Sequence, residues 1–402
     1  MKYQQTLLSD LFDIGSSKRV LKSQWRASGI PFYRGREVTK LSEDGYVENE
    51  LFIDPEHFEQ LASKSGVPSQ GDIIITAIGT IGNTYIVKEN DKFYFKDASV
   101  LWLKKKSQIV TEYINWWFKS SSMKSQLDEG NGATVDTLTI KKLQSLIVPV
   151  PPIDEQKRIV AMLDEAFADI DKARELTEQN LKNAHELFES YLQKIFKGVT
   201  SSDSLMRLED LVTSDCSLSY GIVQPGDNIH GGVPVVRPVD LTSEILYRDG
   251  LKRVLPKVSD GYKRTILTGD ELLLCVRGST GKFSMAHPEL AGANVTRGIV
   301  PIRFDDNRIE KRFAFYQFLS PIIQKQIKAA TYGAALMQIN IRDLKKIKMV
   351  VPTLENQRKT IGKLEAVYPE LLRTAEIYEN KLRKLDELKS AVLQRSFQYH
   401  CQ

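Results

Sequence analysis

Residues 277–282 read Arg-Gly-Ser-Thr-Gly-Lys, a combination of glycine, hydroxyl and basic side chains that can surround a phosphate group. A nucleotide-binding loop also needs a serine or threonine directly after its lysine, whereas Phe283 occupies that place. A methyltransferase tetrapeptide of the Asn-Pro-Pro-Tyr type is absent, because residues 150–153 read Val-Pro-Pro-Ile. The sequence therefore predicts an ordinary loop at 277–282 and no catalytic centre in this chain.

Histidine and cysteine residues do not have the spacing of metal ligands. The histidines are His57, His185, His230, His287 and His400, and the cysteines are Cys216, Cys275 and Cys401. We therefore expect no metal site, no cofactor bound by this chain and no disulfide framework, and we expect a reducing compartment.

Other residues combine basic, amide and aromatic side chains, as nucleic-acid binding requires. Arginine can bind guanine, and asparagine or glutamine can bind adenine, through two hydrogen bonds in the major groove. Lysine and hydroxyl side chains more often bind phosphates, which positions a protein without reading the sequence. A solvated basic surface is the simpler interpretation for any single residue. The predicted DNA-binding residues are Lys18, Arg19, Lys22, Gln24, Trp25, Tyr33, Arg34, Arg36, Thr80 and Asn83 in the first half, and Tyr220, Gln224, Arg237, Arg277, Ser279, Thr280, Lys282, Asn294 and Arg297 in the second.

Length and composition describe a folded protein of two or three domains. The chain has 402 residues, of which 42% are hydrophobic and 27% are charged, and a net charge of +5. These values exclude a disordered or fibrous chain. The N-terminus lacks a secretory signal, and no apolar run is long enough to span a bilayer. We therefore expect an intracellular, cytoplasmic protein that does not contact a membrane.

An internal repeat must position the predicted DNA-binding residues. A shift of 201 residues aligns 132–196 with 333–397 without a gap, and 16 of these 65 pairs are identical. Upstream, 29–34 resembles 232–237 with a shift of 203, and 71–75 resembles 269–273 with a shift of 198. The changing shift indicates loops of different length on the surface. The chain is therefore predicted to contain two copies of one unit of about 200 residues.

Each unit begins with an α+β globular region, at 1–150 and at about 206–351. Short β-branched runs at 72–78, 85–87 and 100–103 predict strands, and helices are expected near 111–126 and 311–328. Arg34 and Arg237 align, which also suits a shared structural role. Ile78 and Arg277 differ at matching positions and are therefore better candidates for reading different bases. Lys141-Lys142 and Lys345-Lys346 contact phosphates or belong to the plain surface.

Each unit ends with a long helix. The prolines at 149, 151 and 152 end a strand, and Asp154 is a suitable N-cap for a helix that runs to Lys197. This helix of about 44 residues would be roughly 66 Å long. Apolar residues at 163, 167, 170, 181, 184, 188, 191 and 195 form a coiled-coil seam, and Pro369 should kink or restart the second helix near Tyr368.

The two helices either pack on their own domains or, as we favour, on each other, which leaves apolar surface for a partner. The predicted packing residues are Gln156, Leu163, Phe167, Ile170, Leu181, Phe188, Gln357, Leu364, Leu371, Leu382 and Leu385. The helices carry little net charge, so the two globular regions together hold +7. Basic charge is therefore concentrated where nucleic-acid binding would require it.

The repeated entry into each helix resembles the specificity (HsdS) subunit of type I restriction–modification systems. Residues 151–158 read Pro-Pro-Ile-Asp-Glu-Gln-Lys-Arg, and 352–359 read Pro-Thr-Leu-Glu-Asn-Gln-Arg-Lys. The order of globular region and long helix, repeated over the whole chain, is similar too. The resemblance implies target recognition domains at 1–150 and 206–351, spacer helices at 151–198 and 352–402, and a linker at 199–205. The implied fold class is α+β, with two pseudo-repeated domains joined by two long antiparallel coiled-coil helices.

The resemblance also implies a subunit without catalytic activity. Each recognition domain would read one half of a bipartite, asymmetric site in double-stranded DNA, and the helices would set the spacer. Two methyltransferase subunits with S-adenosylmethionine would dock on it, and restriction subunits with ATP and Mg²⁺ would join them. A methylation or type IIB-like system without a separate translocating subunit is the alternative. An enzyme in its own right is disfavoured by the missing motifs, and a scaffold that does not bind DNA is disfavoured by the +7 charge.

Overall fold

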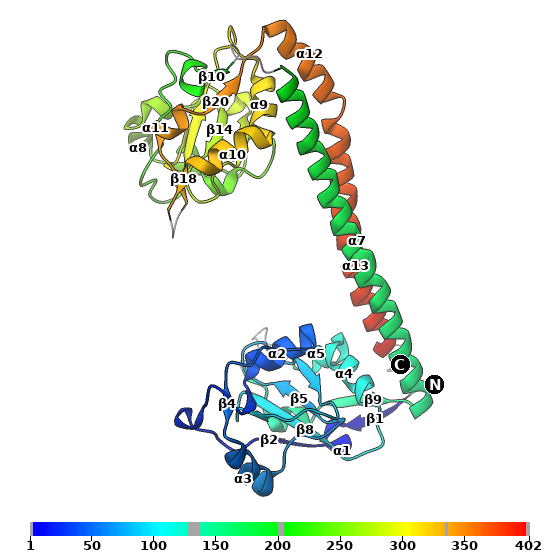
Figure 1. Ribbon diagram of the computed structural model, residues 1–402. Coiled ribbons are helices and arrows are strands. Elements are labelled where there is room, and N and C mark those ends of the chain that lie inside the picture. The colour runs from blue at the N-terminus through cyan, green and yellow to red at the C-terminus, as the bar shows by residue number, and fades with distance from the viewer. Residues whose placement is uncertain (1–2, 128–136, 200–204, 334–336, 399–402) are drawn as a thin grey trace. The chain divides into compact units, whose positions relative to one another are not determined.

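The computed structural model in Figure 1 describes residues 3–127, 137–199, 205–333 and 337–398. The chain divides into two compact units, and unit 1 consists of residues 1–177 and 380–402. Unit 2 consists of residues 178–379. Most of the predicted linker at 199–205 lies outside the described residues.

Unit 1 is built around a four-stranded antiparallel sheet and a smaller three-stranded sheet. The main sheet has the order β2 (Phe12–Ser16), β8 (Val100–Lys105), β5 (Ile73–Thr76) and β6 (Thr84–Ile86). The smaller sheet has the order β4 (Phe52–Ile53), β3 (Ile30–Tyr33) and β7 (Tyr94–Phe95), and β1 (Gln4–Leu7) pairs with β9 (Ile147–Val150). The shorter helices are α1 (Leu8–Leu11), α2 (Gly35–Asp44), α3 (Pro55–Ser65), α4 (Thr111–Lys119), α5 (Ser121–Leu127) and α6 (Ile140–Gln144).

Unit 2 repeats this plan. Its main sheet has the order β12 (Ile245–Leu246), β15 (Phe283–Ala286), β14 (Leu272–Cys275) and β17 (Ile299–Ile302). Its other sheets are β13 (Lys252–Val254), β11 (Val233–Val236) and β16 (Asn294–Val295), then β10 (Leu205–Arg207) with β20 (Lys348–Val350), and β18 (Thr331–Tyr332) with β19 (Gln338–Ile339). The helices are α8 (Pro256–Asp260), α9 (Lys311–Leu319), α10 (Pro321–Ala330) and α11 (Ile341–Lys345).

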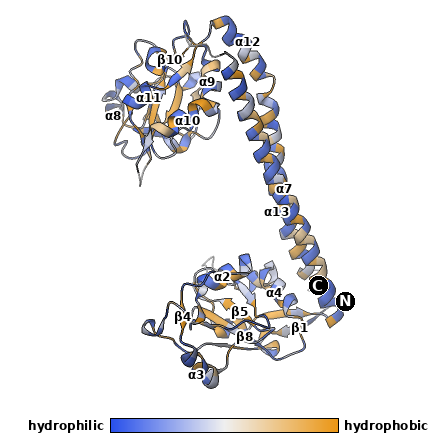
Figure 2. Cartoon of the chain, viewed as in Figure 1, coloured by the Kyte–Doolittle hydropathy of each residue, from blue (hydrophilic) through white to orange (hydrophobic). Residues whose placement is uncertain are grey.

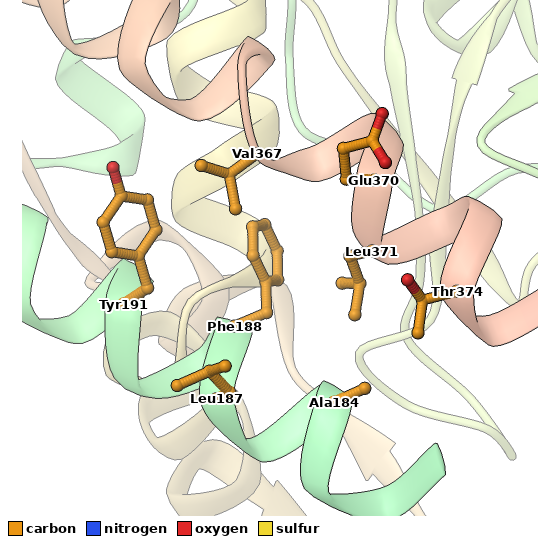
Figure 3. A pocket seen from close by; sticks show the side chains of 8 residues that line it. All are labelled: Ala184, Leu187, Phe188, Tyr191, Val367, Glu370, Leu371 and Thr374. Atoms are coloured by element: carbon orange, nitrogen blue, oxygen red, sulfur yellow. The ribbon is translucent and has the colours of Figure 1, made fainter. Parts of the chain in front are cut away.

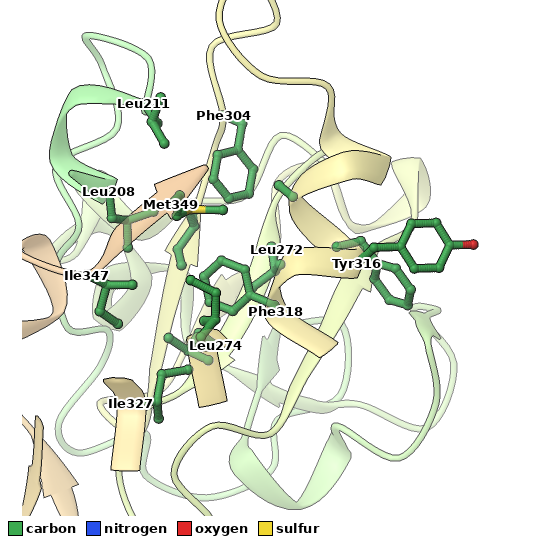
Figure 4. Close-up of a cluster of buried hydrophobic side chains, with 14 of the residues drawn as sticks. Leu208, Leu211, Leu272, Leu274, Phe304, Tyr316, Phe318, Ile327, Ile347 and Met349 are labelled. Atoms are coloured by element: carbon green, nitrogen blue, oxygen red, sulfur yellow. The ribbon is translucent and has the colours of Figure 1, made fainter. Parts of the chain in front are cut away.

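The central strands β5 and β14 are buried on both faces, which explains their continuous apolar sequences. Leu272 and Leu274 of β14 pack into the cluster under α9 and α10 that Figure 4 shows. Leu273 and Cys275 pack into a second cluster on the opposite face, and all four side chains are fully buried. Burial of each leucine contributes about 2 kcal/mol of hydrophobic stabilisation. The prediction of two repeated α+β domains is confirmed.

The strands correct the register of the upstream repeat. Residues 73–76 in β5 match 272–275 in β14, a shift of 199 instead of 198, so that Asp72 matches Glu271. The sheets also differ at their edges. In unit 1 the strand β2 pairs with β8, whereas in unit 2 only an isolated bridge, Val212 to Phe304, lies at that edge. Instead, β12 adds to the other edge and runs parallel to β15.

The predicted helices at 111–126 and 311–328 are each two helices. Ser120 separates α4 from α5, and its hydroxyl donates to the Trp117 carbonyl oxygen at 2.7 Å. In unit 2 the side chain of Ser320 caps the start of α10, and Pro321 takes the first position of that helix. Both serines are buried, so the sequence could have indicated these breaks through its serine–serine and serine–proline pairs.

The long helices are α7 (Ile153–Val199), α12 (Leu354–Glu365) and α13 (Tyr368–Gln398). Asp154 lies inside the first turn of α7, so its prediction as the N-cap is wrong. Thr353 caps α12, because its hydroxyl accepts from the Asn356 N–H. The break before Tyr368 confirms the effect predicted for Pro369, which cannot continue the hydrogen-bond ladder of the preceding helix.

In unit 1 the first part of α7 lies antiparallel to the end of α13. Lys389 donates to Asp171 at 2.7 Å, and Arg174 forms an ion pair with Asp386. Ile159, Leu163 and Phe397 also pack into the core of the globular region. The two predicted arrangements, helix on domain and helix on helix, therefore occur together in this unit.

In unit 2 the last part of α7 lies antiparallel to α12 and to the start of α13. The Phe188 and Tyr368 rings stack with centroids 5.3 Å apart. The predicted seam positions Tyr191 and Ile195 are half-buried, whereas Leu192 and Phe196 are almost fully buried against the globular core. The end of α7 therefore has a second buried face, which packs on the globular core and which the seam positions alone did not predict. Figure 2 shows the alternating hydrophilic and hydrophobic positions along these helices.

Among the residues that the structure describes, no helix combines the length and apolar character that a bilayer crossing needs. In the same residues, no cluster of three or more His, Cys, Asp or Glu side chains is arranged to hold a metal ion.

Candidate nucleic-acid interface

Four backbone segments of unit 2 lie side by side and present the arginines that the sequence analysis favoured. The segments are 222–224, 296–298, 276–278 and 337–339, and we call them the arginine strip. The Arg297 N–H donates to the Ile222 carbonyl oxygen at 2.8 Å, and the Val276 N–H donates to the Gly298 carbonyl oxygen at 2.8 Å. The Gly278 N–H donates to the Met337 carbonyl oxygen at 2.8 Å, and Arg277 and Gln338 form a bridge. Backbone hydrogen bonds thus connect all four segments.

The side chains of the arginine strip are basic, amide or apolar apart from the hydroxyl of Thr296, and none is acidic. Arg297 and Gln224 are exposed, and Arg277 is half-buried. Neither Arg277 nor Arg297 forms an ion pair within the described part of the chain, unlike Arg237 and Arg303. Two positive charges without counter-ions on a rigid frame favour the binding of a polyanion.

Tyrosine side chains flank the arginine strip. The Tyr220 hydroxyl donates to the Ile339 carbonyl oxygen at 2.9 Å, and burial raises the pKa of this tyrosine. Tyr332 of β18 donates to Asn340 Oδ1 at 2.5 Å and accepts from Gln338 Nε2 at 3.1 Å. Tyr332, Gln338 and Met337 are absent from the predicted site. Nothing in their local sequence distinguishes them, because the hairpin of β18 and β19 brings them to Arg277.

In unit 1 the matching surface has a different chemistry. The Ala77 N–H donates to Ser99 O at 2.9 Å, as Val276 does to Gly298, and Ile78 bridges Thr137 as Arg277 bridges Gln338. In the same register, Ala98 takes the place of Arg297, and Asp97 takes that of Thr296. The segment 16–18 completes this surface, because the Ser17 hydroxyl donates to the Phe95 carbonyl oxygen at 2.7 Å. Unit 1 therefore presents an exposed isoleucine where unit 2 presents an arginine.

The remaining predicted basic residues of unit 1 are either exposed without an ion pair or paired within the unit. Lys18, Arg19 and Lys22 are exposed and form no ion pair among the described residues, so they remain candidates for DNA contact. Arg36 is paired with Glu50 at 2.7 Å.

Arg34 and Arg237 share a structural contact. The backbone N–H and guanidinium of Arg34 donate to the Glu37 carboxylate at 2.6–3.0 Å. Arg237 makes the same set of bonds to Asp240 at 2.7–3.1 Å. Both arginines thus close a turn after the central strand of their smaller sheet, β3 or β11. These contacts agree with the shared structural role suggested by their alignment.

Asn294 is fully buried, and the prediction of a base contact for it is wrong. Its Oδ1 accepts from the Thr265 hydroxyl at 2.7 Å, and its Nδ2 donates to Ser259 Oγ at 3.0 Å and to the Tyr262 carbonyl oxygen at 3.2 Å. A buried amide needs such partners, and here they connect β16 with α8 and with the segment that follows it.

Several other predicted residues also have internal contacts. Gln24 Oε1 accepts from the Leu21 N–H at 2.8 Å, and Asn83 Nδ2 donates to the Thr39 hydroxyl at 3.2 Å. Trp25 packs on Phe32 with ring centroids 6.0 Å apart, and Tyr33 stacks on Phe93 at 4.6 Å. The exposed residues Thr80, Ser279 and Lys282 and the half-buried Thr280 belong to the two glycine turns that follow Ile78 and Arg277.

Buried carboxylates fix the start of the strands that lead to these turns. Burial alone would raise the pKa of Glu271, but the Thr268 N–H at 2.7 Å and the Arg303 guanidinium at 2.8 Å hold it below its usual value. In unit 1 the Asp72 carboxylate accepts from Trp102 Nε1 at 2.9 Å. The strands β5 and β14 are thus anchored at one end, and the turns with Ile78 and Arg277 follow at the other.

Gln156 and Gln357 connect each globular region to its long helix. Gln156 Oε1 accepts from the Val110 N–H at 2.9 Å, and its Nε2 donates to the Pro151 carbonyl oxygen at 2.7 Å. Gln357 makes the matching bonds to the Glu310 N–H and the Pro352 carbonyl oxygen, both at 2.8 Å. Both side chains are buried inside their own unit. The predicted packing residues Leu163, Ile170, Phe188 and Leu364 are also buried, and Phe167, Leu181, Leu371, Leu382 and Leu385 are half-buried.

An apolar groove of about 450 Å³ lies in unit 2 where the helix breaks between α12 and α13. Figure 3 shows Phe188 and Leu187 of α7 on one side and Val367 and Leu371 on the other. Leu187 is 73% exposed, so α7 presents apolar surface that its own unit does not cover.

A family model described as "Type I restriction modification DNA specificity domain" matches residues 2–182 and 206–380. The EcoBI type I specificity subunit of Escherichia coli is 23% identical over 66% of this chain and 61% of its own length. The putative type I specificity subunit S.HindORF215P of Haemophilus influenzae is 32% identical over 39% of this chain and 38% of its own length. The match to these two relatives thus spans less than two thirds of their length.

Solved structures share the fold over nearly the whole chain. A chain from a study of complex assembly and conformational transition in a type I R-M system superimposes with a TM-score of 0.73, at 17% identity, over 99% of this chain and 98% of that one. The HsdS subunit of Thermoanaerobacter tengcongensis superimposes with a TM-score of 0.54, at 16% identity, over 99% and 97%.

Proposed function

Because the chain belongs to the type I restriction-modification DNA specificity family, we propose that it is the DNA-reading subunit of such a complex. Each unit would bind one half of a bipartite site in double-stranded DNA. The two units differ in sequence, so the site would be asymmetric. The observation that carries this proposal is the pair of matching surfaces, one with Arg277 and Arg297 and the other with Ile78.

The long helices would set the number of unread base pairs between the half-sites. Within unit 1 the antiparallel contacts of Asp171 with Lys389 and of Arg174 with Asp386 support a fixed register of the two helices. The exposed apolar groove at Phe188 and Leu371 supports a second role, the docking of methyltransferase subunits.

Catalysis would belong to the partner subunits. Two methyltransferase subunits would bind S-adenosylmethionine and methylate adenine, and the target base would leave the stack for this reaction. Restriction subunits would use ATP and Mg²⁺. This chain would contribute binding energy and sequence selection, and it would act in the cytoplasm, where the DNA of the host lies.

Co-purification with a methyltransferase subunit encoded beside this chain tests the proposal. The complex should methylate adenine in a two-part sequence, and either protein alone should not. Methylation or cleavage by the isolated chain would refute the assignment of catalysis to the partners. Methylation by the complex without any translocating subunit in the cell would favour the alternative of a methylation or type IIB-like system.

A further inference from the structure

The backbone of Arg277 is held in place by its neighbours, whereas its guanidinium forms no ion pair among the described residues. The preceding residue Val276 is fully buried, and the following Gly278 has a φ of +82°, a conformation that favours glycine. Gly298 on the neighbouring segment packs closely, since a Cβ atom there would lie 2.5 Å from Pro238 Cγ. The Cβ of Arg277 lies 3.9 Å from that same point, so the segment with Gly298 runs directly beside the base of this side chain.

The guanidinium of Arg277 has no carboxylate partner among the residues that the structure describes. Other arginines of unit 2 do, as Arg237 with Asp240 and Arg312 with Glu244 and Glu365. A guanidinium without a carboxylate partner breaks no ion pair when it binds a new acceptor, and its two parallel N–H groups are held in one plane that matches two adjacent acceptors.

Guanine presents this pattern in the major groove, where O6 and N7 are both acceptors. Adenine presents one acceptor and one donor, so it does not satisfy two donors. Phosphate oxygens would also accept, but Arg277 is half-buried and bridges Gln338, whose amide bonds to Tyr332, and this surrounding of hydrogen-bonding side chains suits a base edge that carries sequence information. Arg297 on the next segment is exposed and adds positive charge close by.

We propose that Arg277 is a specificity-determining residue that reads a guanine in the half-site of unit 2. The inference rests on the proposed function and names the base that this surface selects. Ile78 occupies the matching position in unit 1, so unit 1 lacks this guanine contact and its half-site has a different base requirement there.

Selection from a pool of randomised duplexes tests this inference, with the full chain assembled with its methyltransferase subunits. The wild-type complex should enrich a two-part motif with a guanine in one half. Arg277→Ala should lower the preference for that guanine by about 10- to 100-fold and leave the other positions unchanged. Arg277→Lys keeps the charge but not the paired donors, so it should lose the same preference and retain more of the overall affinity.

Two further variants complete the design. Ile78→Arg should change the base preference in the other half only. Lys363→Ala removes an exposed positive charge on α12, outside the arginine strip, and should leave the motif unchanged. A midpoint of thermal unfolding equal to that of the wild type establishes that the fold of each variant is intact.

Arg277→Ala that weakens binding to all duplexes alike, with the guanine retained, would refute the inference and assign Arg277 to a phosphate. If Ile78→Arg and Arg277→Ala both changed the base preference of the same half-site, the assignment of the two matching surfaces to different half-sites would be refuted. A wild-type complex that enriches no two-part motif would instead refute the proposed function.

Discussion

Replacing Gln357 with alanine should destabilise unit 2 selectively. The side chain is 0% exposed and pairs with three backbone groups, the Glu310 N–H and the carbonyl oxygens of Pro352 and Arg308, at 2.8–2.9 Å. The variant leaves these groups without that partner, at a cost of about 1 to 3 kcal/mol for each group that stays dry. Because water can enter the space left by the amide, we expect a total of about 3 to 5 kcal/mol.

The matching glutamine provides an internal comparison. Gln156 pairs with only two backbone groups, so Gln156→Ala should cost about 2 to 4 kcal/mol, and the cost should fall on unit 1. For a unit of this size, each kcal/mol lowers the midpoint of thermal unfolding by about 2 to 4 °C. Gln357→Ala should therefore lower the midpoint of unit 2 by roughly 6 to 20 °C.

Calorimetry combined with hydrogen exchange measures the two units separately. Gln179→Ala is the control, because Gln179 is exposed on α7 and its amide bonds to Asn183 alone among the described residues. The loss of this amide should change the midpoint by less than about 2 °C. A loss of less than about 1 kcal/mol in the free energy of unfolding of unit 2 for Gln357→Ala would refute the role of Gln357 in joining the globular region to its long helix. Equal destabilisation of both units by either variant would refute the assignment of each glutamine to its own unit.

Three further outcomes follow from the contacts described. The pKa of Glu271 is below its usual value in the folded state, so the ionised carboxylate stabilises unit 2 above pH 4.5. This stabilisation is lost as the pH falls toward the folded pKa. Glu271→Gln should therefore remove this part of the acid sensitivity when the free energy of unfolding is measured as a function of pH. Deletion of 171–177 together with 383–389 removes seven residues from each of two helices whose residues 171 and 389, and 174 and 386, are in contact. Because seven helical residues rise about 10 Å, the spacer should become shorter by about 3 base pairs. Methylation mapping should show this shorter spacer with both half-sites unchanged. Arg312→Met should destabilise unit 2 by about 1 to 2 kcal/mol in urea unfolding, because it leaves Glu244 and Glu365 without their guanidinium partner while water screens these partly exposed carboxylates; an unchanged midpoint would contradict this.

Periodic and repeated features were accessible from the sequence because they depend on local rules. The helix α7 follows from the segment 154–197, which has no glycine or proline, and the break at Tyr368 follows from Pro369. The order of the strands does not follow from such rules, since β12 and β2 join opposite edges of otherwise matching sheets. The choice depends on long-range packing, which a single sequence does not display.

The candidate site was predicted in part, and the errors have a common physical cause. Asn294 and Arg297 are three residues apart and have similar polar character, yet one is buried under Thr265 and the other is exposed. Linear spacing cannot separate a side chain that satisfies the backbone from one that faces solvent. Gln338 and Tyr332 were missed for the converse reason, because only the hairpin brings them to Arg277.

The repeat itself separates the two kinds of residue. Positions that hold the fold have the same chemistry in both units, such as Gln156 and Gln357 at the start of the helices. Positions on the matching surfaces do not, such as Ile78 and Arg277, although their backbones make the same bridge. A fold can tolerate this difference because neither side chain has an internal polar partner among the described residues. The surface where equivalent backbones carry different side chains is therefore the part of each unit best suited to select a different DNA sequence.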